Sequence, residues 1–145
     1  QLTYNTGQQH GPFDVLLSTA PPIQSRTLLG SHSAALDKSF SRVVMDPCWT
    51  VMLQTAEPLA ASFDGAFVRN SSLSWIARNS SKPNRSAAYC WVLQASGAWS
   101  REHLEDTPDT IASAVTAEFW QVLKQTPQPL EFVTAHRWRY AAPQE

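Results

Sequence analysis

The chain has 145 residues, of which 43% are hydrophobic and 16% charged, and its formal net charge at pH 7 is −1. This length suits one domain with a sizeable core, because roughly 68–70% of the unfolded surface is buried at this size. The nearly neutral charge argues against a general nucleic-acid binder, which needs a basic surface.

The first thirty residues predict a hairpin, a buried strand and a short helix. Leu2–Tyr4 has strand character, and Asn5–Gln8 is typical of a hairpin loop. Phe13–Thr19 is a continuous apolar run, as in a strand buried on both faces. Pro21-Pro22 then begins a helix that ends near Leu29, since proline is favoured in a first turn.

The middle of the chain predicts one more short helix and several strands. The strand candidates are rich in aromatic and β-branched residues. The helix is expected at Ser33–Phe40, the strands at Trp49–Thr55, Ala66–Val68, Leu73–Arg78 and Ala87–Ala95, and a turn at Asn70-Ser71.

The last third predicts the longest helix. Ser100 is a plausible N-cap for a short turn through Leu104, and Asp106 or Thr107 caps the long helix, with Pro108 near its first position. Apolar residues then recur at helical spacing: Ile111, Val115, Phe119 and Leu123. A proline-rich loop at Thr126–Leu130 and a strand at Glu131–Tyr140 complete the pattern. The sum is an α+β fold, a mostly antiparallel mixed sheet with one long helix and short helices on one face.

The two cysteines, Cys48 and Cys90, are far apart in sequence. A secreted disulfide scaffold would use more, so they predict free thiols in a reducing compartment. No basic segment followed by an apolar run indicates a secretory signal, and no apolar run reaches about 18 residues. We therefore expect a cytoplasmic protein without a membrane partner. The histidines and cysteines show no metal-ligand spacing, so no metal site is predicted.

The loop after the strand Leu73–Arg78 is the best candidate for ligand binding. Arg78, Lys82 and Arg85 lie close together with no acidic residue among them. Arginine offers a planar fork of donors for a carboxylate or phosphate. A solvated hairpin tip made of good turn residues explains the same composition. Both interpretations stay open.

The closing strand adds a second candidate surface. Its alternation places His136, Trp138 and Tyr140 on one face and Arg137 and Arg139 on the other. The aromatic side chains could stack on a ligand or form core, with the arginines solvated. The tryptophans of the other strands, Trp75 and Trp91 among them, leave the same two alternatives.

Several stretches, taken in order, resemble one family. They are FDVLLSTAPPIQSRTLL, DPCWTVML, FDGAFVRNSSLSWIARNSSKPNR, WVLQASGAWSREHLED and AHRWRYAAP. Together they resemble the renalase-like NAD/FAD-dependent oxidoreductases of bacteria, within the wider amine-oxidase-type flavoproteins. The match covers essentially the whole chain. It implies a Rossmann-type FAD domain paired with a substrate domain of a mixed sheet and helices.

The resemblance implies a domain division and a missing part. Residues 1–30 match the trailing strand and helix of the FAD-binding domain, and residues 31–145 match the substrate-binding domain. The family's GxGxxG and its second FAD segment are absent from this sequence, which begins with Gln1. We therefore expect a piece of a longer protein that does not retain FAD alone. Its partners would be the missing FAD-binding domain and a small-molecule substrate, with self-association through exposed apolar surface.

The resemblance also implies site residues. Ala20, Pro21 and Pro22 match a segment that passes near the dinucleotide. The substrate-binding candidates are Arg78, Asn79, Lys82, Trp91, Gln94, His136, Trp138 and Tyr140. Many relatives carry histidine where Gln94 stands, and glutamine can hydrogen-bond but cannot titrate. No catalytic residue is assigned.

The implied activity is oxidation of a reduced nicotinamide or an amine-like small molecule by hydride transfer to FAD. Such transfer needs placement and exclusion of water and no protein nucleophile. The alternative is a free-standing α+β ligand-binding or interaction module without redox activity.

Overall fold

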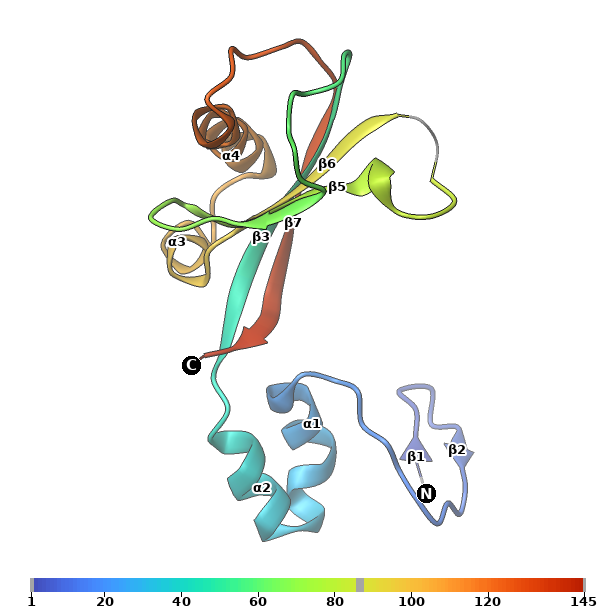
Figure 1. The fold of residues 1–145 in the computed structure, drawn as a ribbon. Helices are drawn as coiled ribbons and strands as arrows, with labels where there is room; N and C mark the ends of the chain where they lie inside the picture. Colours follow the sequence, from blue (N-terminus) through green and yellow to red (C-terminus); the bar gives the residue numbers. More distant parts are fainter. Residues whose placement is uncertain (1, 86–87, 145) are drawn as a thin grey trace. The chain divides into compact units, whose positions relative to one another are not determined.

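The structure is a computed structural model that describes residues 2–85 and 88–144. The chain forms two compact units, residues 1–43 and residues 44–145 (Figure 1). The sequence resemblance predicts a domain boundary between residues 30 and 31, on the expectation that residues 1–30 belong to an FAD-binding domain. That assignment stays a prediction. Ala87, the expected first residue of a strand, lies outside the described residues.

The first unit begins with the expected hairpin. Its strands are β1 (Leu2–Thr3) and β2 (Gln9–His10), which pair antiparallel. The Gly7 N–H donates to the Tyr4 carbonyl oxygen at 2.9 Å, and Gly7 has φ +80°. Glycine suits this position because it adopts positive φ at no steric cost. The predicted loop is therefore confirmed.

The prediction of a buried strand at Phe13–Thr19 is wrong. These residues form no strand, and Val15 and Leu17 are 76% and 85% exposed. A strand buried on both faces needs hydrogen-bonded neighbours on both sides. Within the described part of this unit, only the two-residue pair β1–β2 forms a sheet, so the apolar run has no strand beside it.

Both expected short helices are present. They are α1 (Pro22–Leu29) and α2 (Ala34–Ser41), joined by a 3₁₀ turn, η1 (Gly30–His32). Pro22 occupies the first helical position of α1, where its missing N–H costs nothing. The Ser33 hydroxyl caps α2 by accepting from the Leu36 N–H. Arg26 and Asp37 form an ion pair at 2.7 Å that ties the two helices together.

The second unit is a five-stranded sheet with helices. Its strand order is β4-β5-β6-β3-β7, and every neighbouring pair is antiparallel. The elements are β3 (Met45–Thr55), β4 (Gly65–Phe67), β5 (Leu73–Arg78), the 3₁₀ turn η2 (Asn79–Ser81), β6 (Tyr89–Ala95), α3 (Gly97–Glu102), α4 (Pro108–Leu123) and β7 (Leu130–Pro143). The predicted α+β fold class is confirmed.

The core lies between this sheet and α4. Thr107 caps the helix, and its side chain accepts from the Thr110 N–H. The helical spacing of Ile111, Val115 and Phe119 brings all three onto one face, where each is fully buried. They meet alternate residues of the two central strands: Trp49, Val51 and Leu53 of β3, and Trp91, Leu93 and Ala95 of β6.

Ser100 is not an N-cap, contrary to expectation. The cap of α3 is Ser96, whose hydroxyl accepts from the Trp99 N–H at 3.3 Å. Ser100 lies inside the helix, fully buried, and its hydroxyl accepts from the Trp49 N–H at 3.1 Å. As residue types, the two serines suit an N-cap equally well. Ser100 instead accepts from the backbone N–H of Trp49 in β3, a contact that the local sequence does not reveal.

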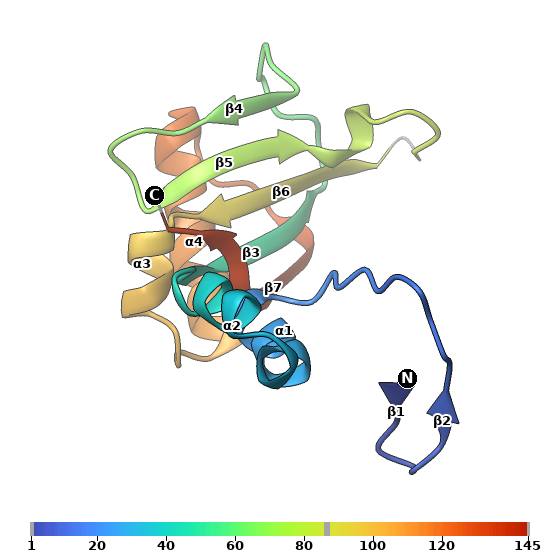
Figure 2. The same cartoon turned by 90° about the horizontal axis from the view of Figure 1, so that it is seen from below.

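The helices α3 and α4 lie on the same face of the sheet (Figures 1 and 2). We name the other side of the sheet the open face, because no helix of the second unit covers it. Opposed residues in antiparallel strands share a face. Thr50 pairs with both Gln94 and His136, so these three side chains lie on the open face, while Val51 belongs to the core.

Acid should weaken the second unit through two carboxylates. The pKa of Asp46 is lowered because Arg101 hydrogen-bonds it, with Gln144 adding a second bond. The pKa of Glu105 is lowered chiefly by its hydrogen bond from Arg139. Such groups stabilise the fold fully above the unfolded carboxyl pKa, near pH 4, and the contribution is lost as the pH falls through the lowered folded value.

We expect the double variant Asp46→Asn, Glu105→Gln to show a flatter pH dependence of stability than the parent between about pH 4 and pH 2. Urea midpoints followed by tryptophan fluorescence measure this, since all six tryptophans lie in the second unit. Glu102→Gln, on an exposed carboxylate of α3, is the control and should leave the profile unchanged. An unaltered profile in the double variant would contradict the prediction.

Candidate functional site

The middle of the open face carries neutral side chains. Successive pairings across the sheet place aromatic, amide, hydroxyl and thiol groups together on it. Between Cys48 and Gln54 of β3 and across to their partners, the paired positions of this face contain no Asp, Glu, Lys or Arg: these positions are Gly65 and Phe67 of β4, Trp75 and Ala77 of β5, Cys90, Val92 and Gln94 of β6, Cys48, Thr50, Met52 and Gln54 of β3, and Phe132, Thr134, His136 and Trp138 of β7. Two carboxylates border this stretch: Asp46, which pairs with Ala142 at the start of β3, and Glu131, which accepts a hydrogen bond from the Gln54 amide.

A hollow of about 460 Å³ lies where the open face meets α3 and the end of β7. We call it the sheet-end hollow. It contains Gln94, Trp138 and Tyr140, three of the predicted substrate-binding residues, so the structure brings them together as expected. His136 packs edge-on against Trp138, with ring centroids 4.6 Å apart, and does not line the hollow. The other lining residues are Asp46, Pro47, Cys48, Ser74, Ala95, Gly97, Ala141 and Ala142.

Cys48 lines the same hollow and was not among the predicted site residues. Its sulfur lies 3.7 Å from the Thr50 hydroxyl and 3.6 Å from the Ala95 carbonyl oxygen. Burial raises the pKa of this thiol, so it stays neutral near pH 7. A single cysteine in a sequence does not indicate that it lines a pocket, because the residues around Cys48, such as Ala95 and Trp138, come from other strands.

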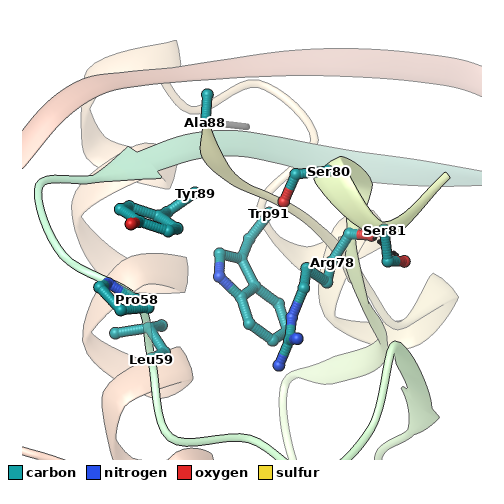
Figure 3. A pocket seen from close by; sticks show the side chains of 8 residues that line it. All are labelled: Pro58, Leu59, Arg78, Ser80, Ser81, Ala88, Tyr89 and Trp91. Atoms are coloured by element: carbon teal, nitrogen blue, oxygen red, sulfur yellow. Dashed lines mark hydrogen bonds between the residues drawn. The ribbon is translucent and has the colours of Figure 1, made fainter. Parts of the chain in front are cut away.

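A second hollow, of about 300 Å³, lies beside the cationic loop (Figure 3). We call it the loop hollow. The Arg78 guanidinium lies over the Trp91 ring, 5.3 Å from its centroid. An Nη of Arg78 donates to the Ala61 carbonyl oxygen at 2.7 Å. The remaining lining residues are Pro58, Leu59, Ser80, Ser81, Ala88 and Tyr89.

The loop contributes less to this hollow than the sequence suggests. Asn79 opens the turn η2 and is half-buried, whereas Lys82 and Arg85 are exposed. None of the ion pairs among the described residues involves Lys82 or Arg85, and neither lines the hollow. A solvated hairpin tip accounts for these two cations.

The predicted substrate-binding residues therefore fall into two groups. Arg78 pairs with Trp91, and Trp91 pairs with the core residue Leu53, so these side chains lie on the helix-covered side of the sheet. Gln94 and Trp138 lie on the open face. Whether each residue contacts a substrate stays a prediction.

Replacing Arg78 by alanine should lower the free energy of unfolding by about 1–3 kcal/mol, because a charged hydrogen bond to the loop at Ala61 and a contact with Trp91 are both lost. Lys82→Ala should stay within about 0.5 kcal/mol of the parent, because its side chain is exposed and forms no ion pair with another described residue. Chemical denaturation followed by tryptophan fluorescence compares the two. Equal stability of both variants would contradict an anchoring role for Arg78.

The predicted cofactor segment lies in the first unit. The Ala20 carbonyl oxygen accepts a hydrogen bond from the buried Ser25 hydroxyl at 2.9 Å, which fixes the chain at the start of α1. Pro22 has no N–H, so the first position of this helix offers no donor to a phosphate. The role of Ala20, Pro21 and Pro22 in cofactor binding stays a prediction.

Metal-binding clusters and membrane-spanning helices are both absent from residues 2–85 and 88–144. Nowhere in these residues do three His, Cys, Asp or Glu side chains come close enough together to hold a metal ion. None of their helices combines the length and the apolar character needed to cross a membrane.

The fold of the chain has counterparts among solved structures. No family model matches the chain. The fold is similar to part of a crystal structure described as "Putative protoporphyrinogen oxidase from Exiguobacterium sp. 255-15", with a TM-score of 0.69 at 16% sequence identity. The likeness covers 88% of this chain but 29% of that one. It shows a shared fold.

Proposed function

We propose that this chain is the substrate-side part of an FAD-dependent oxidoreductase of the renalase-like group. In this proposal the open face covers the flavin ring, and the sheet-end hollow receives a reduced nicotinamide or an amine-like small molecule. The observation that carries the proposal is the open face, which is uncharged at its paired positions between Cys48 and Gln54 and ends in a hollow lined by Gln94, Trp138 and Tyr140, with Asp46 at its edge. The shared fold with a described oxidase supports it.

The residues of the open face fit an uncharged, flat ring. Its aromatic and aliphatic side chains offer apolar contact, and the exposed Gln94 offers a polar anchor, the mixture typical of small-molecule sites. The sequence contains no recognisable motif for binding the phosphates and the adenosine part of FAD. The chain has five single glycines and no GxGxxG, so a second domain must hold the phosphates. Residues 1–30 would belong to that domain.

The chain's own residues would position the substrate and exclude water. Bound FAD would supply the hydride acceptor. The rings of Trp138 and Tyr140 wall the sheet-end hollow, and the Gln94 amide can donate to or accept from a substrate without titrating. The neutral Cys48 thiol adds a weak donor at the same place.

The test uses the product of the complete reading frame that contains this sequence. We expect it to purify yellow, to release FAD on denaturation, and to oxidise NADH, NADPH or a primary amine with reduction of the bound flavin. Fractionation of the producing cells would check the expected cytoplasmic location. A colourless product that takes up no FAD would overturn the proposal and favour a ligand-binding module without redox activity.

A further inference from the structure

The loop hollow lies on the opposite side of the sheet from the open face. Arg78 and Trp91 oppose each other across β5 and β6, and Trp91 opposes Leu53 of the core. A ligand in this hollow would therefore not touch a group that lies on the open face. Any binding here is independent of the proposed oxidoreductase site.

The Trp91 indole N–H has no acceptor among residues 2–85 and 88–144. Trp91 is 2% exposed, and its ring packs against Phe63 and Phe119 at centroid distances of 6.2 and 5.5 Å. No hydrogen bond joins its Nε1 to another described residue, and this atom is not among the fully enclosed unsatisfied ones, so it borders the hollow. In Figure 3 it lies on the ring edge that faces Pro58 and Leu59.

The other fully buried tryptophan of the sheet, Trp49, does have an acceptor for its indole N–H. The Trp49 Nε1–H donates to the His103 carbonyl oxygen at 2.9 Å, as a buried indole N–H usually does. A buried donor left without an acceptor is costly. Among the described residues no group accepts from this donor, so the fold leaves it directed at the loop hollow, where solvent or a bound molecule can accept from it.

The other polar groups of the hollow are mainly donors as well. Arg78 has five N–H groups, and its known contacts are the Ala61 carbonyl oxygen and a longer approach of 3.8 Å to the exposed Asp64 carboxylate. The Ser80 hydroxyl lines the hollow and can rotate to donate. No Asp or Glu lines it. This set of donors favours an anionic acceptor with at least two oxygens.

The apolar residues that line the loop hollow indicate the shape and polarity of the remainder of a ligand. Leu59, Pro58 and the rings of Tyr89 and Trp91 are apolar surfaces, and a volume of about 300 Å³ is at the lower end for ligand pockets. We propose that the loop hollow binds a small carboxylate with a flat apolar body, an arylcarboxylate. Its carboxylate would accept from Arg78 and the Trp91 indole, and its ring would lie between Leu59 and Tyr89.

Nuclear magnetic resonance of the indole N–H groups tests this with benzoate as the probe. The Trp91 signal is identified by its loss in Trp91→Phe. We expect benzoate to move the Trp91 signal in a saturable way below about 10 mM, whereas the Trp49 signal stays in place. Benzamide, which has the same ring and no charge, should bind roughly tenfold more weakly.

Variants locate the binding. Arg78→Gln should weaken benzoate binding roughly tenfold, and Ser80→Ala should weaken it less. Arg69→Gln, on an exposed arginine outside the hollow, is the matched control and should bind as the parent does. The Trp49 signal reports whether each variant is folded. An unmoved Trp91 signal, equal binding of benzamide, or full binding by folded Arg78→Gln would each overturn the proposal.

Discussion

Phe119→Ala should lower the free energy of unfolding of the second unit by about 3–5 kcal/mol, the usual cost of removing a buried aromatic ring. Phe119 is fully buried in α4 and contacts two tryptophans, with ring centroids 5.5 Å from Trp91 and 5.4 Å from Trp120. The cavity would open where α4 meets β6, so helix and sheet would separate more easily.

Urea denaturation followed by tryptophan fluorescence measures this effect. Phe67→Ala is the matched control, because the same side chain is 84% exposed on β4 and its loss should cost less than about 1 kcal/mol. Similar losses for Phe119→Ala and Phe67→Ala would mean that the helix contributes little to the core.

Gln94→Glu should lower kcat/KM for the reduced substrate roughly tenfold or more in the complete protein, if the open face covers the flavin ring as proposed. The substitution keeps the shape of the side chain and adds one charge at a position whose direct partners, Thr50 and Trp75, are neutral. A charge without a partner beside an apolar ring costs about 1–3 kcal/mol or more, and 1.4 kcal/mol corresponds to a factor of ten.

Gln121→Glu makes the same chemical change on the exposed side of α4 and should leave kcat/KM unchanged. Steady-state oxidation assays and the absorbance of retained flavin compare the two variants. If both behave like the parent, the open face does not approach the reacting groups, although the flavin content itself would still test the broader proposal.

Exposed apolar residues in the first unit bear on the expected partners. Val15 and Leu17 are largely exposed, and they lie in the run that was expected to be a buried strand. The expectation that this surface docks against an FAD-binding domain or mediates self-association stays a prediction. Light scattering of the 145-residue chain over a range of concentrations is the direct measurement.

Several elements could be predicted because their signals are local. The cap at Thr107, the proline after it and apolar residues at Ile111, Val115 and Phe119 are sufficient to identify α4. The strands of the second unit follow from aromatic and β-branched runs separated by turn residues. Alternation along β7 correctly indicated that His136 and Trp138 share a face.

Other features depend on partners that are distant in sequence. Ser96 and Ser100 suit an N-cap equally, and the backbone of Trp49 decides between them. Arg78 and Lys82 look alike in one cationic loop, but pairing of β5 with β6 sets only Arg78 against Trp91. Phe13–Thr19 has the composition of a central strand, yet a strand exists only where neighbours share its hydrogen bonds.

The sequence by itself determined the α+β class and the long helix with its cap at Thr107, because these depend on short-range periodicity and composition. Only the tertiary structure decided which candidates meet. Strand register placed Gln94 and Trp138 on the open face, and Arg78 and Trp91 on the helix-covered side. Register is a long-range property, set by which face of each strand is buried, and no single segment contains it.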